Sequence, residues 1–203
     1  MKILCIGRNY ADHIQELANE KPDDPVVFLK PDTALVIENQ IVTYPKFTQD
    51  MHHELEIVLR ISKEGKDIAE KDAPDYFDAI GLGIDFTARD LQTKLKTKGL
   101  PWEIAKAFDH SAPISEFYSK SEFPDLNNLN FYLHVNGQKR QTGNTSLMLF
   151  PFNEIISWIS RYFSLIPGDL VFTGTPAGVS AVKPGDRLEA WLEDKKTLDF
   201  LVS

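Results

Sequence analysis

The chain has 203 residues, of which 42% are hydrophobic and 26% charged, a composition typical of a folded globular protein and not of a disordered one. Its 22 basic and 30 acidic residues give a net charge of −8, which argues against a nucleic-acid partner because binding to a phosphate backbone requires clustered positive charge. No apolar stretch reaches the roughly 18 residues of a membrane-spanning helix, and the N-terminal run lacks the features of a secretion signal. We therefore expect a single cytoplasmic domain, residues 1–203, with no membrane partner.

The first part of the chain combines short strand-like runs with turn residues. Residues 2–6 and 26–29 are predicted to form strands, and residues 9–19 an exposed short helix or ordered loop. Two further apolar runs, 35–37 and 41–44, are predicted to pair as a hairpin across the polar residues between them.

The middle of the chain contains a strand, a second strand and a helix. Polar and apolar residues alternate from 53 to 61, which predicts a half-buried strand. The apolar run 81–86 predicts another strand. A helix follows it, which we expect Thr87 to cap and which reaches about Lys98.

The last part of the chain contains the strongest local pattern, Asn136-Gly137, which favours the positive φ angles of a tight type I′ turn. It predicts a hairpin between 131–135 and 138–141. Isoleucines at helical spacing predict an amphipathic helix over 153–163. Further strands are predicted at 170–173, 187–192 and 198–202. Many strands, few helices and short turns describe a β-rich α+β domain.

Two glutamates in the predicted strand 53–61, Glu54 and Glu56, stand two residues apart and so share one face of it. Like charges side by side repel each other, and a hard, oxygen-binding cation such as Mg²⁺ or Mn²⁺ would neutralise them. A lone pattern of this kind is more often the solvated face of an edge strand. Both interpretations remain open on these two residues alone.

Asp85 lies at the end of an apolar strand, where an unpaired carboxylate would be unfavourable. Arg89 and Gln92, three residues apart in the helix that follows, share a face that could turn back toward the strand end. A carboxylate, a guanidinium and an amide would then converge on one point. An Asp–Arg ion pair at the start of the helix is the alternative explanation.

Four other residues are candidates for chemistry. His13 and Glu16 lie three apart in the first helical segment, a spacing at which the carboxylate can orient the imidazole as a general base. Lys106 follows an apolar segment, and Thr175 lies in a Gly/Thr loop whose N–H groups and hydroxyl could hold a carboxylate. The structural alternatives are a solvated pair, a lysine at a strand end that reaches solvent, and an ordinary tight connection.

Three residues with reactive side chains are set aside. Cys5 lies in an apolar run with no second cysteine to pair with, and we expect a buried structural thiol. His52 and His53 adjoin Glu54, but adjacent side chains of a strand point to opposite faces. We therefore include neither histidine among the ligands.

Taken together, these motifs resemble the fumarylacetoacetate hydrolase family, in particular its short, single-domain branch of acylpyruvases and oxaloacetate decarboxylases. Each motif alone is weak, whereas all of them in family order over nearly the whole chain form a specific pattern. The matching segments are Gly7–His13, Phe28–Pro31, His53–Glu56, Gly83–Gln92, Gly143–Thr145 and Pro167–Gly178.

The resemblance implies a set of site residues. His13 with Glu16 would activate water on a lid segment, residues 11–25, and Lys106 would be a catalytic donor to the developing oxyanion. The implied ligands of one Mg²⁺ or Mn²⁺ are Glu54, Glu56 and Asp85. The implied contacts with a small 2-oxo acid substrate are Arg8, Lys30, Arg89, Gln92 and Thr175.

The resemblance also implies a fold and an activity. The fold would be the family's β-rich roll of mixed sheets with few helices, usually as a homodimer. The activity would be divalent-metal-dependent hydrolysis of the C–C bond of acylpyruvates (2,4-dioxo acids) to pyruvate and a carboxylic acid through a metal-stabilised enolate. Alternatives are an oxaloacetate decarboxylase or tautomerase, or a 2-hydroxyhepta-2,4-diene-1,7-dioate isomerase or decarboxylase. A noncatalytic module that binds metal and organic acids, and a purely structural protein, are the alternatives outside enzymes.

Overall fold

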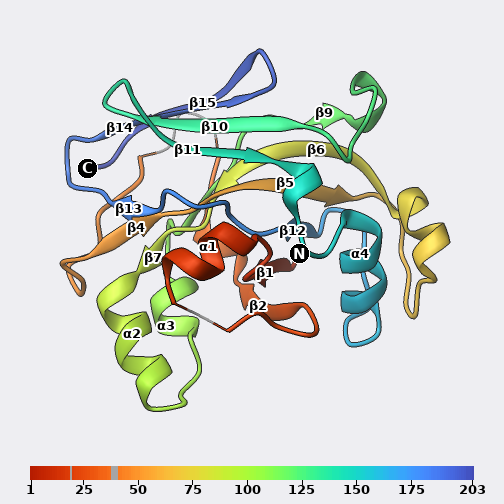
Figure 1. The fold of residues 1–203 in the computed structure, drawn as a ribbon, viewed down its shortest axis with the longest axis horizontal. Helices are drawn as coiled ribbons and strands as arrows, with labels where there is room; N and C mark the ends of the chain where they lie inside the picture. Colours follow the sequence, from red (N-terminus) through yellow and green to blue (C-terminus); the bar gives the residue numbers. More distant parts are fainter. Residues whose placement is uncertain (19, 38–40) are drawn as a thin grey trace.

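The computed structural model describes residues 1–18, 20–37 and 41–203 (Figure 1). Its largest element is a six-stranded mixed sheet. The strands are β1 (Ile3–Gly7), β2 (Val26–Lys30), β5 (Leu55–Ile61), β6 (Phe77–Ile84), β9 (Tyr118–Ser119) and β12 (Leu170–Phe172). They lie in the order β2-β1-β12-β5-β6-β9, with β1 parallel to β12 and the other neighbouring pairs antiparallel.

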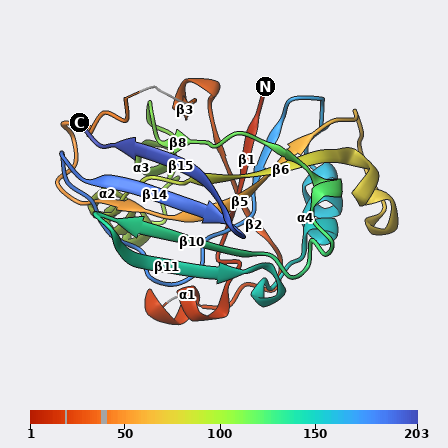
Figure 2. The same cartoon turned by 90° about the horizontal axis from the view of Figure 1, so that it is seen from above.

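A second, four-stranded antiparallel sheet lies over one face of the first (Figure 2). Its strands are β10 (Asn130–Val135), β11 (Gln138–Asn144), β14 (Arg187–Leu192) and β15 (Lys195–Leu201). Alternate residues of β10 and β14, such as Phe131, Leu133 and Leu188, are fully buried and form one core with Leu55 and Ile57 of β5. The two sheets therefore hold the main core between them.

The other face of the six-stranded sheet carries a second apolar cluster, which includes Cys5, Val58 and Phe172. Cys5 is fully buried, as predicted. Val58 shares its face of the sheet with Glu54 and Glu56, because side chains alternate along a strand. The prediction of a half-buried strand over 53–61 was wrong, since β5 lies in the interior of the sheet with apolar side chains against both faces. Glu54 and Glu56 are buried instead of facing water, whereas Arg60 is partly exposed and pairs with Asp78.

The helices are short and lie at the margins of the sheets (Figures 1 and 2). They are α1 (Ala11–Glu16), α2 (Arg89–Thr97), α3 (Glu103–Lys106) and α4 (Phe152–Ser160). Helices α2 and α3 lie at one end of the sheets and α4 at the other. Among the described residues, no helix is long and apolar enough to cross a membrane. Two small sheets complete the fold, formed by β4 (Met51–His53), β7 (Thr87–Ala88) and β13 (Ser180–Ala181), and by β3 (Leu35–Val36) and β8 (Ala112–Pro113).

Several local predictions are confirmed. The hairpin of β10 and β11 turns at Asn136 and Gly137, whose φ angles are 51° and 75°, as a type I′ turn requires. Helix α4 occupies most of the predicted range 153–163. The fold as a whole is a β-rich α+β arrangement of mixed sheets, as predicted.

One local pairing was predicted wrongly. The run 35–37 does not pair with 41–44: β3 runs parallel to β8, and Val42 forms a bridge with Val202. The turn proposed between these runs, residues 38–40, lies outside the described residues. Both runs pair with segments far away in the sequence, because the pairing of a short apolar segment depends on its tertiary surroundings.

Three helices near the carboxylates also differ from the prediction. Thr87 belongs to β7, its hydroxyl donates to the carbonyl of Asp85 at 3.3 Å, and α2 has no side-chain cap. Lys106 ends the short helix α3 instead of a strand. Helix α1 is shorter than the predicted range 9–19, and its His13 is buried instead of exposed.

Candidate active site

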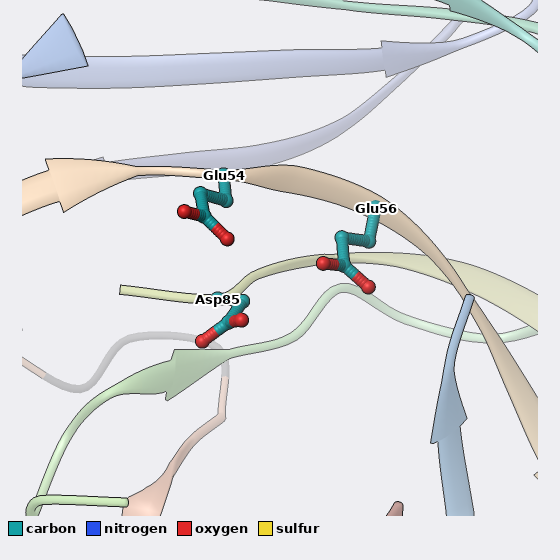
Figure 3. A group of neighbouring side chains, drawn as sticks. All are labelled: Glu54, Glu56 and Asp85. Atoms are coloured by element: carbon teal, nitrogen blue, oxygen red, sulfur yellow. The ribbon is translucent and has the colours of Figure 1, made fainter. Parts of the chain in front are cut away.

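Three carboxylates meet where β5 begins and β6 ends. Glu54 directly precedes β5 and Glu56 follows two residues later, so both side chains leave the same face. Asp85 directly follows β6, and its backbone N–H donates to the carbonyl of Glu54 at 2.8 Å, which holds the two residues opposite each other. Figure 3 shows the three side chains converging, and one carboxylate oxygen from each lies within 4.8 Å of the others.

Basic side chains surround two of these carboxylates. The ammonium group of Lys106 is buried and lies 2.7 Å from Glu54 Oε2 and 2.5 Å from Asp85 Oδ2. Arg89 donates to the other carboxylate oxygen of Glu54 and, at 2.6 Å, to the amide oxygen of Gln92. Arg89 and Gln92 of α2 therefore turn back toward the strand ends, as their spacing predicted.

Lys30 lies behind the carboxylates, in contact with Asp85. Its ammonium group is fully buried, lies 2.8 Å from Asp85 Oδ1 as an ion pair, and donates to the backbone carbonyls of Phe86, Lys106 and Ser111. It is not among the residues that line the cavity at the carboxylates. In this geometry Lys30 anchors Asp85 and the segments around it, and its contact with a substrate stays a prediction.

The two glutamates respond differently to burial. Burial by itself disfavours both charged carboxylates, but Lys106 and Arg89 beside Glu54 bring the pKa of that carboxyl well below its usual range. None of the ion pairs formed by the described residues includes Glu56. Burial and the neighbouring charge of Asp85 raise the pKa of Glu56 well above its usual range. Glu56 is therefore the carboxylate whose charge is least compensated.

This donor set fits a hard divalent cation. All three donors are carboxylate oxygens, the ligands that Mg²⁺ and Mn²⁺ prefer. Glu56 has no ion-pair partner among the described residues and needs additional positive charge to remain ionised. A cation held by Glu54, Glu56 and Asp85 would supply that charge.

A histidine–glutamate pair from α1 lies at the same place. Nδ1 of His13 is 3.3 Å from Glu16 Oε2, and the other oxygen of Glu16 accepts the backbone N–H of Gly178 at 3.0 Å. Burial lowers the pKa of His13, against the opposing effects of the Glu54 and Glu16 carboxylates. The imidazole is therefore neutral at pH 7. With Nδ1–H donating to Glu16, Nε2 is the atom left to accept a proton.

One narrow cavity of ≈ 40 Å³ brings these groups together. It also contains Lys96 and Trp102, which the sequence did not single out. Glu16 is absent from the cavity wall and acts on it through His13. The predicted residues that line it are Arg8, His13, Glu54, Glu56, Asp85, Arg89, Gln92, Lys106 and Thr175.

The loop after β12 completes the site. Gly174 has a φ of +100°, and a Cβ at this position would lie 2.6 Å from the Cβ of Asn9, so only glycine fits. The buried amide of Asn9 donates to the carbonyls of Thr173 at 2.8 Å and Phe150 at 3.0 Å. The loop is thereby held where the N–H of Gly174 donates to Glu56 at 2.7 Å.

Sequence reasoning missed two buried polar side chains that support the site, Asn9 and Gln141. Asn9 lies inside the first matching segment, 7–13, which marked the region without showing its role. Gln141 stands among exposed polar residues of β11, and no local pattern distinguishes it from them. His53, set aside as a ligand, is buried against Gln141 and lies outside the carboxylate group.

Known proteins match the chain over nearly its whole length. The family model described as fumarylacetoacetate (FAA) hydrolase C-terminal matches residues 2–202. Oxaloacetate tautomerase FAHD1, mitochondrial, from Bos taurus is 44% identical over 200 residues, 98% of this chain and 90% of that protein. Oxaloacetate decarboxylase, mitochondrial, from Dictyostelium discoideum is 44% identical over 185 residues, 91% of this chain and 85% of that protein.

A solved structure shares the fold. Fumarylpyruvate hydrolase from Pseudomonas aeruginosa, in complex with Mn²⁺ and pyruvate, superposes with a TM-score of 0.94 at 38% identity, covering 100% of this chain and 89% of the other. The three relatives are thus named for tautomerisation of oxaloacetate, decarboxylation of oxaloacetate and hydrolysis of fumarylpyruvate. The chain therefore belongs to the fumarylacetoacetate hydrolase family.

Proposed function

We propose that this protein is a divalent-cation-dependent hydrolase that cleaves the C–C bond of acylpyruvates, giving pyruvate and a carboxylic acid. The observation that carries the proposal is the His13–Glu16 pair, whose imidazole shares one cavity with the three carboxylates. Attack of water on a carbonyl requires a general base beside the electrophile, whereas decarboxylation requires none. Fumarylpyruvate, named for the Pseudomonas relative, is itself a 2,4-dioxo acid.

The reaction consumes one water molecule. The oxygen of water bonds to C4 of the substrate, the C3–C4 bond breaks with its electrons on C3 of a pyruvate enolate, and a proton then reaches C3. A cation held by Glu54, Glu56 and Asp85 supplies Lewis-acid stabilisation of the negative charge that develops on the 2-oxo acid. We propose Mg²⁺ or Mn²⁺ for this position.

The side chains that line the cavity have different roles in the reaction. Nε2 of His13 takes the proton of the attacking water, and general-base catalysis of this kind contributes about 10²–10⁴-fold. Lys106 and Gln92 donate to the oxyanion that forms at C4, where one such donor contributes about 3–4 kcal/mol. Arg89 and the hydroxyl of Thr175 hold the substrate's carboxylate.

The cavity requires a movement of α1. Its ≈ 40 Å³ has room for about three water molecules and not for a four-carbon acid. His13 and Leu17 form part of its wall, and the contact between Glu16 and Gly178 holds this wall in place. We propose that α1, within the predicted lid 11–25, opens to admit substrate and closes to bring His13 to the attacking water.

Tautomerisation or decarboxylation of oxaloacetate is the second candidate function. The two relatives that are 44% identical over most of the chain carry these activities in their names. Both reactions pass through an enolate of the same 2-oxo acid head and need no water nucleophile. The same cation site and the same proton donors would therefore support them.

One assay separates the candidates. Protein loaded with Mg²⁺ or Mn²⁺ is given acetylpyruvate, fumarylpyruvate or oxaloacetate, and pyruvate release and enol absorbance are followed. We expect pyruvate from the two acylpyruvates, its loss on chelation with EDTA and its recovery when the cation is restored. Turnover of oxaloacetate alone would replace the first candidate by the second. Normal cation binding without any turnover would contradict both.

We also propose that the protein is a homodimer. The exposed apolar side chains of Met1, Phe47 and Ile104 gather around one surface cavity beside α3, and a second copy of the chain would cover them. Light scattering is expected to give twice the mass of the chain, and Ile104→Glu to give the mass of one chain. A monomeric wild-type protein would refute the proposal.

A further inference from the structure

Gln141 connects the two sheets at the site. It lies in β11 of the four-stranded sheet, is 1% exposed, and reaches both the start of β5 and the loop after β12. Its Oε1 accepts from the backbone N–H of Leu55 at 3.0 Å and lies 2.8 Å from Nδ1 of His53. Its Nε2 donates to Thr175 Oγ1 at 2.8 Å and to the carbonyl of Pro176 at 2.9 Å. All four hydrogen-bonding positions of the amide are thus used.

The orientation of this amide follows from its partners. The backbone N–H of Leu55 can only donate, so the group facing it must be the carbonyl oxygen of Gln141. The carbonyl of Pro176 can only accept, so the group facing it must be the NH₂. His53 must then donate through Nδ1–H, which leaves its Nε2 to accept from the hydroxyl of Ser180 at 2.8 Å.

The same logic sets the direction of the Thr175 hydroxyl. Its oxygen accepts from Gln141, so its own hydrogen is directed elsewhere. The carbonyl of Pro176, at 3.5 Å, lies at the outer limit of a hydrogen bond. Thr175 also lines the cavity with Glu56 and Asp85, where a substrate carboxylate would offer an acceptor.

We propose that Gln141 is a positioning residue that fixes the hydroxyl of Thr175 as a hydrogen-bond donor to the carboxylate of the substrate. This inference rests on the proposed function, because it needs a 2-oxo acid in this cavity. It assigns a role in substrate binding to a residue of the opposite sheet that does not line the cavity. Gln141→Glu should reverse the hydroxyl, since a carboxylate oxygen facing Thr175 would accept its hydrogen.

The test is a double-mutant cycle on ligand affinity. Calorimetry measures oxalate binding to Mn²⁺-loaded wild type, Gln141→Glu, Thr175→Val and the double variant. A hydrogen bond to a charged group predicts a loss of about 10- to 100-fold for each single variant. The double variant should bind oxalate no more weakly than Thr175→Val alone, because Gln141 acts through that hydroxyl. Mn²⁺ affinity, measured separately by electron paramagnetic resonance, should change far less than oxalate affinity, because neither Gln141 nor Thr175 is one of the proposed ligands.

The outcomes separate this inference from the proposed function. If wild type binds Mn²⁺ but no oxalate, the proposed function fails, and this inference with it. Two results would refute only the role of Gln141, provided that wild type and Thr175→Val behave as expected. In the first, Gln141→Glu binds oxalate with full affinity. In the second, the loss of oxalate affinity in the double variant is the product of the losses in the two single variants. Should Gln141→Glu not fold, Gln141→Met replaces it in the cycle with the same expectations.

A second measurement checks the amide orientation without metal or ligand. The ¹⁵N chemical shifts of the His53 ring distinguish its two neutral tautomers. We expect the Nδ1–H form in the wild-type protein and its retention in Thr175→Val. An Nε2–H form would require the Gln141 amide to be reversed and would overturn the proposal.

Discussion

The carboxylate cluster and the His13–Glu16 pair are two parts of one site, built on different supports. Glu54, Glu56 and Asp85 stand at the ends of interior strands whose hydrogen bonds on both sides fix their positions. The pair stands on a helix of six residues, too short to be stable by itself, and the contact of Glu16 with Gly178 fastens it to the opposite loop. In the proposed mechanism, cation binding thus depends on the folded sheet, whereas proton transfer depends on the segment that we propose to move.

The largest expected effect separates these two parts directly. His13→Ala should lower acylpyruvate hydrolysis by about 10²–10⁴-fold, because the attacking water loses its base. Mn²⁺ affinity should not change, since no ligand is touched. Pyruvate release and a Mn²⁺ titration measure the two quantities. His134→Ala, on the four-stranded sheet beside Trp191, is the control and should keep full turnover. An equal loss of Mn²⁺ binding in His13→Ala would show that the two parts are not separate.

Removing Lys30 tests how strongly the sheet supports the carboxylates. Lys30→Met leaves the buried Asp85 without one of its partners and should lower the free energy of unfolding by about 3–5 kcal/mol. Arg60→Met breaks the exposed ion pair with Asp78 and should cost about 1 kcal/mol or less. Urea unfolding of the metal-free proteins compares the two. Equal, small losses would mean that Lys30 is not an anchor.

Glu56→Gln should separate stability from cation binding. Burial raises the pKa of Glu56, so the folded state favours its protonated form and loses stability as pH rises above the ordinary value for Glu. The neutral glutamine should therefore make the metal-free protein more stable at pH 7. It should also weaken Mn²⁺ binding by at least about 100-fold, since even residues behind a ligand contribute 10- to 100-fold. A metal-free variant that is less stable than wild type would contradict this account.

The smallest expected effect concerns His53 and the acid sensitivity of the sheet. Burial lowers the pKa of His53 to about 4, while the unfolded chain takes up this proton near the ordinary value of about 6.5. The stability that His53 contributes is thus present above pH 6.5 and is lost as pH falls toward 4, by about 2 kcal/mol at pH 5. In urea unfolding measured from pH 7 to pH 5, His53→Gln should not show this loss of stability. If the free energy of unfolding changed equally with pH in both proteins, this contribution of His53 would be excluded.

The sequence predicted the parts of the site that depend on local geometry. Period-two spacing placed Glu54 and Glu56 on one face, and helical spacing placed Arg89 beside Gln92. The resemblance to a family supplied the link to Asp85, which lies across the strand pair. These predictions succeeded because each depends on one strand, one helix or one ordered set of motifs.

The features that no sequence pattern revealed depend on partners far away in the chain. The burial of Lys30 follows from the packing of β2 against segments about 56 to 81 residues later. Gln141 stands in a strand of polar residues, and only its contacts with the opposite sheet distinguish it. The run 35–37 found a partner in β8 instead of its neighbour. In each case the deciding contact has no local pattern.

The position of β12 between β1 and β5 has a consequence for folding kinetics. Its parallel pairing with β1 closes a loop of 167 residues, so the central sheet has a high contact order, and we expect slow folding. Until residue 172 has been synthesised, β1 and β5 each lack a neighbour on that side. Gly174, which holds Glu56, follows directly. The nascent chain therefore exposes two unpaired strand edges for most of its synthesis, and the proposed cation site is complete only at the end of folding.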